Sequence, residues 1–278
     1  MQFGAMNFPV TPVLDEIETF ARLGFDYLEL AMDPPMAHHD RLFADRKAII
    51  RALAVGGLGL VCHLPTFVTT ADLTESLRRA SVTEMLRSLE VAADLGATKV
   101  VLHPSMAGGM GAFVMDRVKR HAFDFFSQMV VVAQRLDVTI CLENMFPRNR
   151  LGVEPDDFEE IFKAFPSLKM TLDTGHANID DRRGRRLKGL VERFGRRIGH
   201  LHFSDNRGKL DDHLAVGQGT VNFEDLVGRL KATGYNDTLT LEVFDANRKM
   251  LVDSRVRIEA LFADGPSDKG TMDSRGCC

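Results

Sequence analysis

Residues His200–Gly219 read HLHFSDNRGKLDDHLAVGQG. The apolar start of this segment, with the residues just before it, predicts a buried strand over Ile198–Phe203 that runs into a polar loop. The loop carries Asp211 and His213 in an Asp-x-His pair. Imidazole nitrogen and carboxylate oxygen are the usual ligands of zinc- and manganese-type ions, so this strand end has the composition of a metal site. A buried structural histidine followed by a solvated acidic turn has the same composition, and this segment alone does not separate the two.

The composition is that of a globular protein with one large domain. The chain has 278 residues, 45% hydrophobic and 27% charged, and a net charge of -4. This charge argues against non-specific attraction to nucleic acid, although it leaves room for a local basic groove. Four scattered cysteines exclude a disulfide framework. Because no window approaches the ~20 apolar residues of a membrane span, we expect a cytoplasmic protein without a membrane partner.

Short apolar stretches alternate with amphipathic helical patterns along the whole chain. The predicted strands lie at residues 2–8, 27–31, 59–63, 99–103, 138–143, 168–173, 198–203 and 238–243. The predicted helices lie at 12–23, 42–55, 73–95, 113–136, 155–165, 184–194, 223–233 and 248–262. Eight such units favour a closed (β/α)8 TIM barrel over an open doubly wound sheet. We expect a single α/β domain at residues 1–263 and a polar, poorly ordered tail at 264–278.

Seven of the predicted strands end on or near a side chain that can bind a metal or move a proton. These side chains are Glu29, His63, His103, Glu143, Asp173, His202 and Glu242. In a barrel of parallel strands, chemistry is assembled at the carboxyl ends. Residues two apart on a strand share a face of the sheet. Two positions before each of these side chains, Glu29 excepted, stands a residue that suits the inner layer of a barrel. Those positions are Val61, Val101, Cys141, Thr171, His200 and Thr240. The candidates are therefore expected to point into the mouth, with His200 as a buried partner beneath His202.

Three further residues extend this candidate cluster. His176 follows Asp173 in Asp-Thr-Gly-His, where a glycine turn can fold the imidazole back toward the mouth, and Asp211 and His213 come from the next loop. With Glu29 set aside, nine residues could then hold two or three ions. Nitrogen and oxygen ligands without a thiolate suit Zn or Mn, and Mg less well. His38 and His39 are expected to be surface residues near the same rim.

On these residues the chain resembles the xylose isomerase-like TIM barrel superfamily. That superfamily includes sugar and sugar-phosphate isomerases and epimerases and the endonuclease IV type of abasic-site repair enzyme, AP endonuclease family 2. The motifs that carry the resemblance are Leu142-Glu143-Asn144, Leu172-Asp173-Thr174-Gly175-His176, His202-Phe203-Ser204-Asp205, Asp211-Asp212-His213, Gly217-Gln218-Gly219 and Glu242.

The isomerases and epimerases of this superfamily imply one divalent ion on Glu143, Asp173, His202 and Glu242. By this resemblance the ion polarises a sugar or sugar phosphate, and Glu143 and Glu242 move protons on opposite sides of it through an enediolate. The side chains expected to contact the substrate are Glu29, His176, Arg148 and Arg207. For Glu29, a place in the barrel wall is an equal alternative.

The endonuclease branch implies three zinc ions and a DNA substrate. The first would bind His63, His103 and Glu143, the second Glu143, Asp173, His202 and Glu242, and the third His176, Asp211 and His213. All nine residues are present, but the chain has no Trp and only two Tyr for probing a duplex, and Leu-Pro-Thr follows His63. We therefore prefer the isomerase or epimerase. A non-catalytic metal-binding barrel is a third hypothesis, disfavoured because both Glu143 and Glu242 are intact; the sequence leaves open whether the chain is a homo-oligomer.

Overall fold

Eight parallel strands close into a barrel in the computed structural model, which describes residues 1–181, 183–245 and 248–263. Each strand pairs with the next along the chain, and the last pairs with the first. The strands are β1 (Gln2–Met6), β2 (Tyr27–Ala31), β3 (Gly59–His63), β4 (Lys99–Leu102), β5 (Thr139–Glu143), β6 (Lys169–Asp173), β7 (Ile198–Phe203) and β8 (Thr238–Leu241). The predicted (β/α)8 barrel is confirmed.

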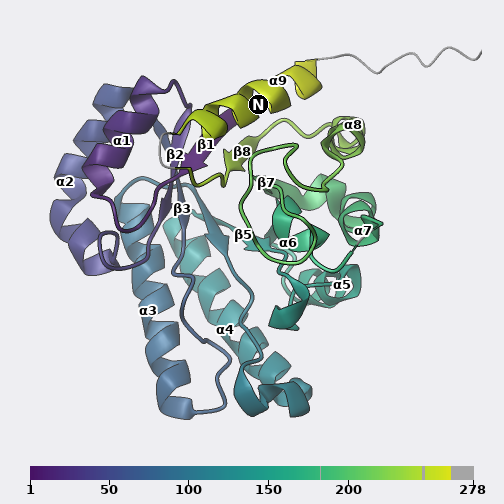
Figure 1. Cartoon of the computed structure of the whole chain (residues 1–278). Helices are drawn as coiled ribbons and strands as arrows, with labels where there is room; N and C mark the ends of the chain where they lie inside the picture. Colours follow the sequence, from purple (N-terminus) through teal and green to yellow (C-terminus); the bar gives the residue numbers. More distant parts are fainter. Residues whose placement is uncertain (182, 246–247, 264–278) are drawn as a thin grey trace, which may run out of the picture.

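Helices surround the strands, with α1 and α2 on one side in Figure 1 and α5, α7 and α8 on the other. Their bounds are α1 (Val13–Arg22), α2 (His39–Gly56), α3 (Glu75–Asp94), α4 (Met115–Leu136), α5 (Pro155–Ala164), α6 (Thr174–Asn178), α7 (Arg185–Phe194), α8 (Phe223–Thr233) and α9 (Lys249–Ala263). Short 3-10 turns lie at η1 (Gly109–Phe113), η2 (Pro147–Asn149) and η3 (Gly195–Arg197). None of the helices within the described ranges is both long and apolar enough to cross a bilayer.

Most of the predicted helices have bounds within two residues of the prediction, and two regions differ more. The α2 helix begins at His39, earlier than predicted, because the His38 ring accepts a hydrogen bond from the backbone N–H of Asp40 and caps the helix. The predicted glycine turn after β6 is instead the short helix α6, capped by the side chain of Asp173. The predicted tail at 264–278 lies outside the described residues.

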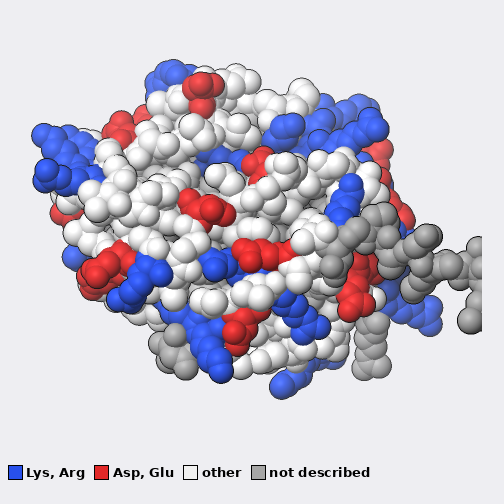
Figure 2. Space-filling view, turned by 90° about the horizontal axis from the view of Figure 1, so that it is seen from above, with Lys and Arg blue, Asp and Glu red and all other residues white. Residues whose placement is uncertain are grey.

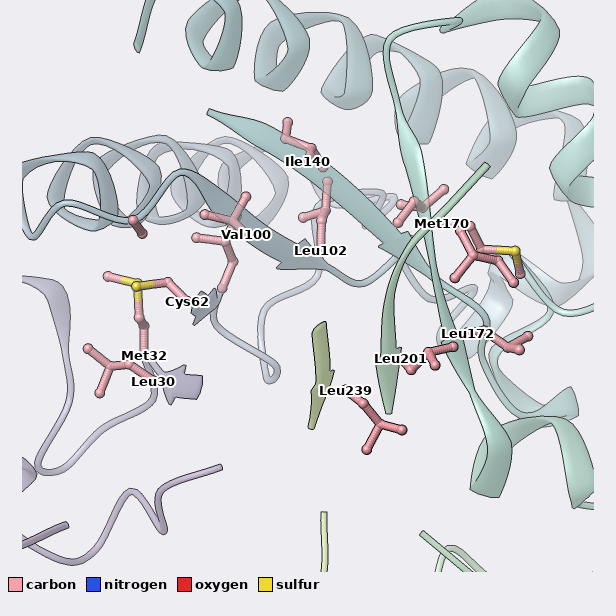
Figure 3. Close-up of a cluster of buried hydrophobic side chains, with 14 of the residues drawn as sticks. Leu30, Met32, Cys62, Val100, Leu102, Ile140, Met170, Leu172, Leu201 and Leu239 are labelled. Carbon is pink, nitrogen blue, oxygen red and sulfur yellow. The ribbon is translucent and has the colours of Figure 1, made fainter. Parts of the chain in front are cut away.

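The main hydrophobic core lies between the barrel and the helices. Alternate strand residues point outward into it, among them Leu30, Cys62, Val100, Ile140 and Leu201 (Figure 3). Each large apolar side chain buried in this way stabilises the fold by about 1.5–3 kcal/mol relative to exposure. The helices thereby hold the strands in the register that sets the height of every inward-pointing residue.

The barrel interior is different in composition. Tyr27, Val61 and Val101 form a small apolar cluster of their own. The Tyr27 hydroxyl lies 2.8 Å from the Thr240 hydroxyl, and its ring passes so close to Gly4 that a Cβ there would lie 2.2 Å from it. Thr171, His200 and Thr240, predicted for this layer, are fully buried. The chain therefore lines the upper barrel with polar groups beneath the mouth.

Candidate metal centre

The nine predicted ligands meet at the carboxyl ends of the strands, around the carboxylate of Glu143. Glu143 is the last residue of β5, and Asp173 ends β6 directly opposite His202 of β7. His63 ends β3, while His103 and Glu242 directly follow β4 and β8. The ring of strand ends that the sequence predicts is therefore a contiguous set of side chains.

One oxygen of Glu143 faces two histidines. Its Oε2 atom lies 3.3 Å from His63 Nε2 and 3.0 Å from His103 Nε2. Ligand atoms bound at about 2.0–2.1 Å around a tetrahedral ion stand about 3.3 Å from one another. These three side chains therefore already have the spacing of a ligand set.

The other oxygen of Glu143 belongs to a second set around His202. The Nδ1 atom of His202 lies 3.3 Å from Glu143 Oε1, 3.2 Å from Glu242 Oε1 and 3.7 Å from Asp173 Oδ2. These four residues are the set that the resemblance implied for a single ion. Glu143 is shared between the two sets, so an ion in either one would be held by the same carboxylate.

Asp211 joins two histidines into a third group. Its Oδ2 atom lies 3.2 Å from His176 Nε2 and 3.2 Å from His213 Nε2. Phe146 lies against the His176 ring and Phe244 against the His213 ring, with centroid distances of 5.2 Å and 5.1 Å. The group thus lies at the edge of the cluster with aromatic walls beside it.

Backbone carbonyls orient three of the cluster's histidines in the same way. The Nδ1 atoms of His63, His176 and His213 lie 2.8, 3.0 and 3.2 Å from the carbonyl oxygens of Leu64, Asn144 and Glu242. We assign the proton to Nδ1 in each, because a carbonyl can only accept. The Nε2 atoms then carry the free lone pairs and face the carboxylates, as ligand atoms must.

Asp173 is held in place by its neighbours. The Asn144 side chain accepts from the backbone N–H of Asp173 at 2.8 Å and donates to its carbonyl at 2.9 Å. Asp173 Oδ1 accepts from the backbone N–H of His176 at 2.6 Å, which leaves Oδ2 for the cluster. A Cβ on Gly175 would lie 2.5 Å from Ser204 Oγ, so the Asp-Thr-Gly-His motif needs glycine for α6 to approach β7.

A buried carboxylate fixes the loop that carries Asp211 and His213. Asp205 accepts four backbone N–H groups, those of Asn206, Gly217, Gly219 and Val221, at 2.8–3.1 Å. The backbone of Asp205 also pairs with that of Leu214. This role was not predicted, although the sequence motifs included both Asp205 and the Gly-Gln-Gly segment.

Glu29 lies beneath the cluster and not at its rim. It is fully buried in β2, with Oε1 2.9 Å from His202 Nε2 and Oε2 2.9 Å from His200 Nε2. Substrate contact, one of its two predicted roles, does not fit this position, because both oxygens accept from histidines out of reach of solvent. Glu29 instead holds His202 with Nδ1 toward the ligands. His200 is buried and packs against the His202 ring, with centroids 5.0 Å apart, and its Nε2 atom hydrogen-bonds Glu29.

The charges of the cluster depend strongly on one another. Burial alone would raise the pKa of Glu143, but His103 and His202 outweigh it and hold that pKa well below its usual range. Burial, with Glu242, Glu143 and Asp211 nearby, raises the pKa of Asp173 to about 8. Burial would lower the pKa of His213, yet the carboxylates of Asp211 and Glu242 raise it to about 9. A cation bound among these carboxylates would replace the protons that now balance their charge.

The donor set fits a divalent cation. Asp173 Oδ2 and Asp211 Oδ1 are buried, and neither has a hydrogen-bond partner among the described residues. A buried carboxylate oxygen without a partner is costly unless something positive faces it. With imidazole nitrogens and no thiolate around them, these oxygens suit Zn or Mn.

Arg148 and Arg207 stand apart from the cluster. Both are exposed, and no contact of either with the nine ligands occurs among the described interactions. Arg207 lines a separate pocket with Arg183, Lys188 and Arg229. Substrate contact by Arg148 or Arg207 stays a prediction.

Loops around the mouth also expose apolar side chains that were not predicted, namely Phe8, Phe67 and Phe244.

Glu29→Gln is expected to weaken metal binding at the mouth by about 10–100-fold, the usual effect of removing a group that orients a ligand. The amide offers one acceptor to two histidines, and the negative charge that supports His202 is lost. Metal affinity measured by competition with a chromogenic chelator tests this. Glu16→Gln is the matched control, since Glu16 is also buried but pairs with Arg248 and with none of the nine candidate ligands among the described interactions. Equal losses of affinity in the two variants would contradict a specific role for Glu29.

Comparison with known proteins agrees with this architecture. A family model described as Xylose isomerase-like TIM barrel matches residues 17–265. The uncharacterized protein MJ1311 of Methanocaldococcus jannaschii is 31% identical over 249 residues, 87% of this chain and 83% of that protein. A Mycoplasma pneumoniae protein named probable endonuclease 4 is 22% identical over 247 residues, 82% of each chain.

Solved structures with the same fold include sugar epimerases. The structure of a D-tagatose 3-epimerase-like protein is 25% identical, with a TM-score of 0.83, and the match covers 94% of this chain and 97% of that one. A structure described as IOLI protein with a binding zinc atom is 18% identical, with a TM-score of 0.76, and the match covers 94% and 98% of the two chains. The fold is therefore one on which both sugar epimerases and zinc binding occur.

Proposed function

Because this chain belongs to the xylose isomerase-like TIM barrel family, we propose that it is a divalent-metal-dependent epimerase or isomerase of a sugar or sugar phosphate. The observation that carries the proposal is the pair of carboxylates beside one imidazole. Glu143 and Glu242 lie 3.3 Å and 3.2 Å from His202 Nδ1, and Asp173 completes the set. The likeness to a D-tagatose 3-epimerase-like protein supports a sugar as the substrate class.

Glu143 and Glu242 are the groups that we assign to proton transfer. Glu143 accepts the proton from the carbon next to the sugar carbonyl, and Glu242 returns one from the other side, so that the carbon inverts or the carbonyl migrates. A bound divalent ion would supply the positive charge that stabilises the developing enediolate. Glu29 and Asn144 hold His202 and Asp173, the two residues of the set that we do not assign to proton transfer, in position.

A zinc-dependent phosphodiesterase acting on abasic-site DNA is the second candidate function. It is favoured by the His63–His103 pair and the His176–Asp211–His213 group, which a one-ion isomerase does not require. On the face that Figure 2 shows, basic and acidic side chains of the described residues are interspersed. The net charge of -4 and the absence of Trp weigh against this candidate, because such an enzyme must attract a phosphate backbone and probe the duplex. A metal-binding barrel without turnover is the remaining alternative.

Three measurements on the purified protein separate these functions. The first is metal content per chain, and the second is deuterium incorporation next to the carbonyl of ketoses and ketose phosphates incubated in D2O. The third is cleavage of a duplex that contains an abasic site. We expect carbon-bound deuterium and no strand cleavage. Cleavage without sugar exchange would overturn the proposal in favour of the phosphodiesterase, and neither activity would favour the non-catalytic barrel.

His213→Ala is expected to leave sugar turnover within about threefold of wild type, because His213 lies outside the four-residue set around His202. The same change would remove a ligand of the third ion in a phosphodiesterase and is expected to abolish strand cleavage. His121→Ala, on α4 and away from the mouth, is the control. A large loss of sugar turnover in His213→Ala, with no loss in the His121→Ala control, would show that the group of His176, Asp211 and His213 takes part in the reaction.

A further inference from the structure

A second group of metal-binding side chain types lies away from the nine residues at the mouth. His38 caps the start of α2, His39 is the first residue of that helix, and Glu84 lies within α3. The sequence predicts His38 and His39 as surface residues, but His39 is only 4% exposed. Packing of α2 against α3 has brought the His-His pair onto a carboxylate 45 residues later in the chain.

The two imidazoles hold the two oxygens of the same carboxylate. His38 Nε2 lies 3.0 Å from Glu84 Oε1, and His39 Nε2 lies 3.2 Å from Glu84 Oε2. The ring centroids are 4.1 Å apart, and one possible ligand atom from each of the three residues lies within 4.8 Å of the other two. These separations are close to the ~3.3 Å between ligands of one tetrahedral zinc ion.

The carboxylate of Asp40 lies on the Nδ1 side of both rings, opposite the Nε2 atoms that face Glu84. Its Oδ1 atom lies 3.1 Å from His39 Nδ1, and its Oδ2 atom lies 3.6 Å from His38 Nδ1. A carboxylate on the far nitrogen of a ring keeps the proton there and leaves Nε2 free to bind a metal. For His38 this requires a change of tautomer, since its Nδ1 accepts from the Asp40 backbone N–H when no ion is bound.

The group is open enough for an ion to enter and for water to complete its coordination. The side chains of His38 and Glu84 are 34% and 27% exposed, whereas that of His39 is 5% exposed. Two imidazoles and one carboxylate, without a thiolate, favour Zn²⁺ over Mg²⁺ or Ca²⁺, which prefer oxygen ligands.

We propose that His38, His39 and Glu84 form a separate site for a divalent transition-metal ion, with Zn²⁺ as its occupant. The ion would tie the first turn of α2 to α3, outside the reaction centre. Its ligands come from a helix start and from a neighbouring helix, so occupancy would stabilise the packing of the two helices. The proposal does not depend on the reaction catalysed at the mouth.

Zinc stoichiometry after dialysis of the chelator-treated protein against micromolar ZnCl2 tests this site. Glu84→Gln and His38→Ala are each expected to bind one zinc fewer per chain than wild type. Glu90→Gln is the matched control, because Glu90 is also on α3 but forms an exposed ion pair with Arg135. An unchanged count in Glu84→Gln would overturn the proposal and leave the group as a hydrogen-bonded cluster.

Anomalous diffraction at the zinc edge provides an independent check of the position. Crystals of the wild-type protein soaked in ZnCl2 are expected to give a peak between the Nε2 atoms of His38 and His39 and the carboxylate of Glu84. Soaked Glu84→Gln crystals are expected to lose that peak while those at the mouth remain. Peaks at the mouth alone in wild-type crystals would refute the site. The near-isosteric Glu84→Gln change keeps the test valid even if His38→Ala does not fold.

Discussion

Glu143→Gln is expected to lower sugar turnover by about a thousandfold or more and to remove most of the bound metal from the mouth of the barrel. Oε2 of this carboxylate faces His63 and His103, and Oε1 faces His202 and His176. An amide keeps the shape but has no negative charge, and its NH2 group cannot act as a ligand. The change therefore removes the proposed base and weakens both ligand sets that share it.

Steady-state kinetics and metal analysis on the same preparation measure these two effects. Glu160→Gln is the control, because Glu160 forms a surface ion pair with Lys119 and has no contact with the mouth. Circular dichroism and thermal unfolding separate loss of function from loss of fold. A variant with full metal content and turnover within tenfold of wild type would show that Glu143 is neither the shared ligand nor the base.

The barrel itself could be predicted from the sequence because its signals are local. The β7 strand and the α8 helix have the predicted bounds, since an apolar run and a helical pattern with its flanking residues each mark an element without reference to distant residues. The positions of the candidate ligands were also predictable, because parallel strands bring their carboxyl ends to one face. To predict the positions of His63, Glu143 and Asp173, it was enough to know where a strand ends and which residue type stands there.

The residues that position the site could not be predicted in the same way. The role of Glu29 depends on the stagger of the barrel, which places it level with Val61 and below the last residue of β2. Arg207 follows a correctly predicted strand, yet its side chain lines a pocket with residues of α7 and α8. The pairing of His38 with Glu84 depends on how α2 packs on α3, and no local sequence pattern predicts that these two side chains meet.

Hydrogen bonds inside the barrel, below the mouth, orient the imidazole of His202. Inward residues of β2, β7 and β8 form a hydrogen-bonded chain, in which Thr238 contacts His200, His200 contacts Glu29, and Glu29 contacts His202. Burial lowers the pKa of His200, so this ring stays neutral. These hydrogen bonds place the carboxylate of Glu29 against Nε2 of His202. The Nδ1 atom of His202 is then left facing Glu143 and Glu242.

Glu242→Gln is expected to lower the rate of epimer formation by about 100- to 10,000-fold, the range for removal of a general acid or base. Glu242 Oε1 lies 3.2 Å from His202 Nδ1, so the amide weakens one ligand of the set, but Glu143, Asp173 and His202 remain. Glu143 can still exchange the substrate proton with solvent. The variant is therefore expected to keep incorporating deuterium from D2O at the reacting carbon while product of inverted configuration no longer forms.

This split between exchange and product formation distinguishes two carboxylates with separate tasks from a single base that acts on both sides. NMR of the recovered sugar measures both quantities in one sample, and Glu259→Gln on α9, an exposed position paired with Arg255, is the control. Parallel loss of exchange and product would mean that Glu242 acts through the metal alone. Normal product formation would show that Glu242 is not the group that returns the proton, and would favour a single base that acts on both sides of the substrate.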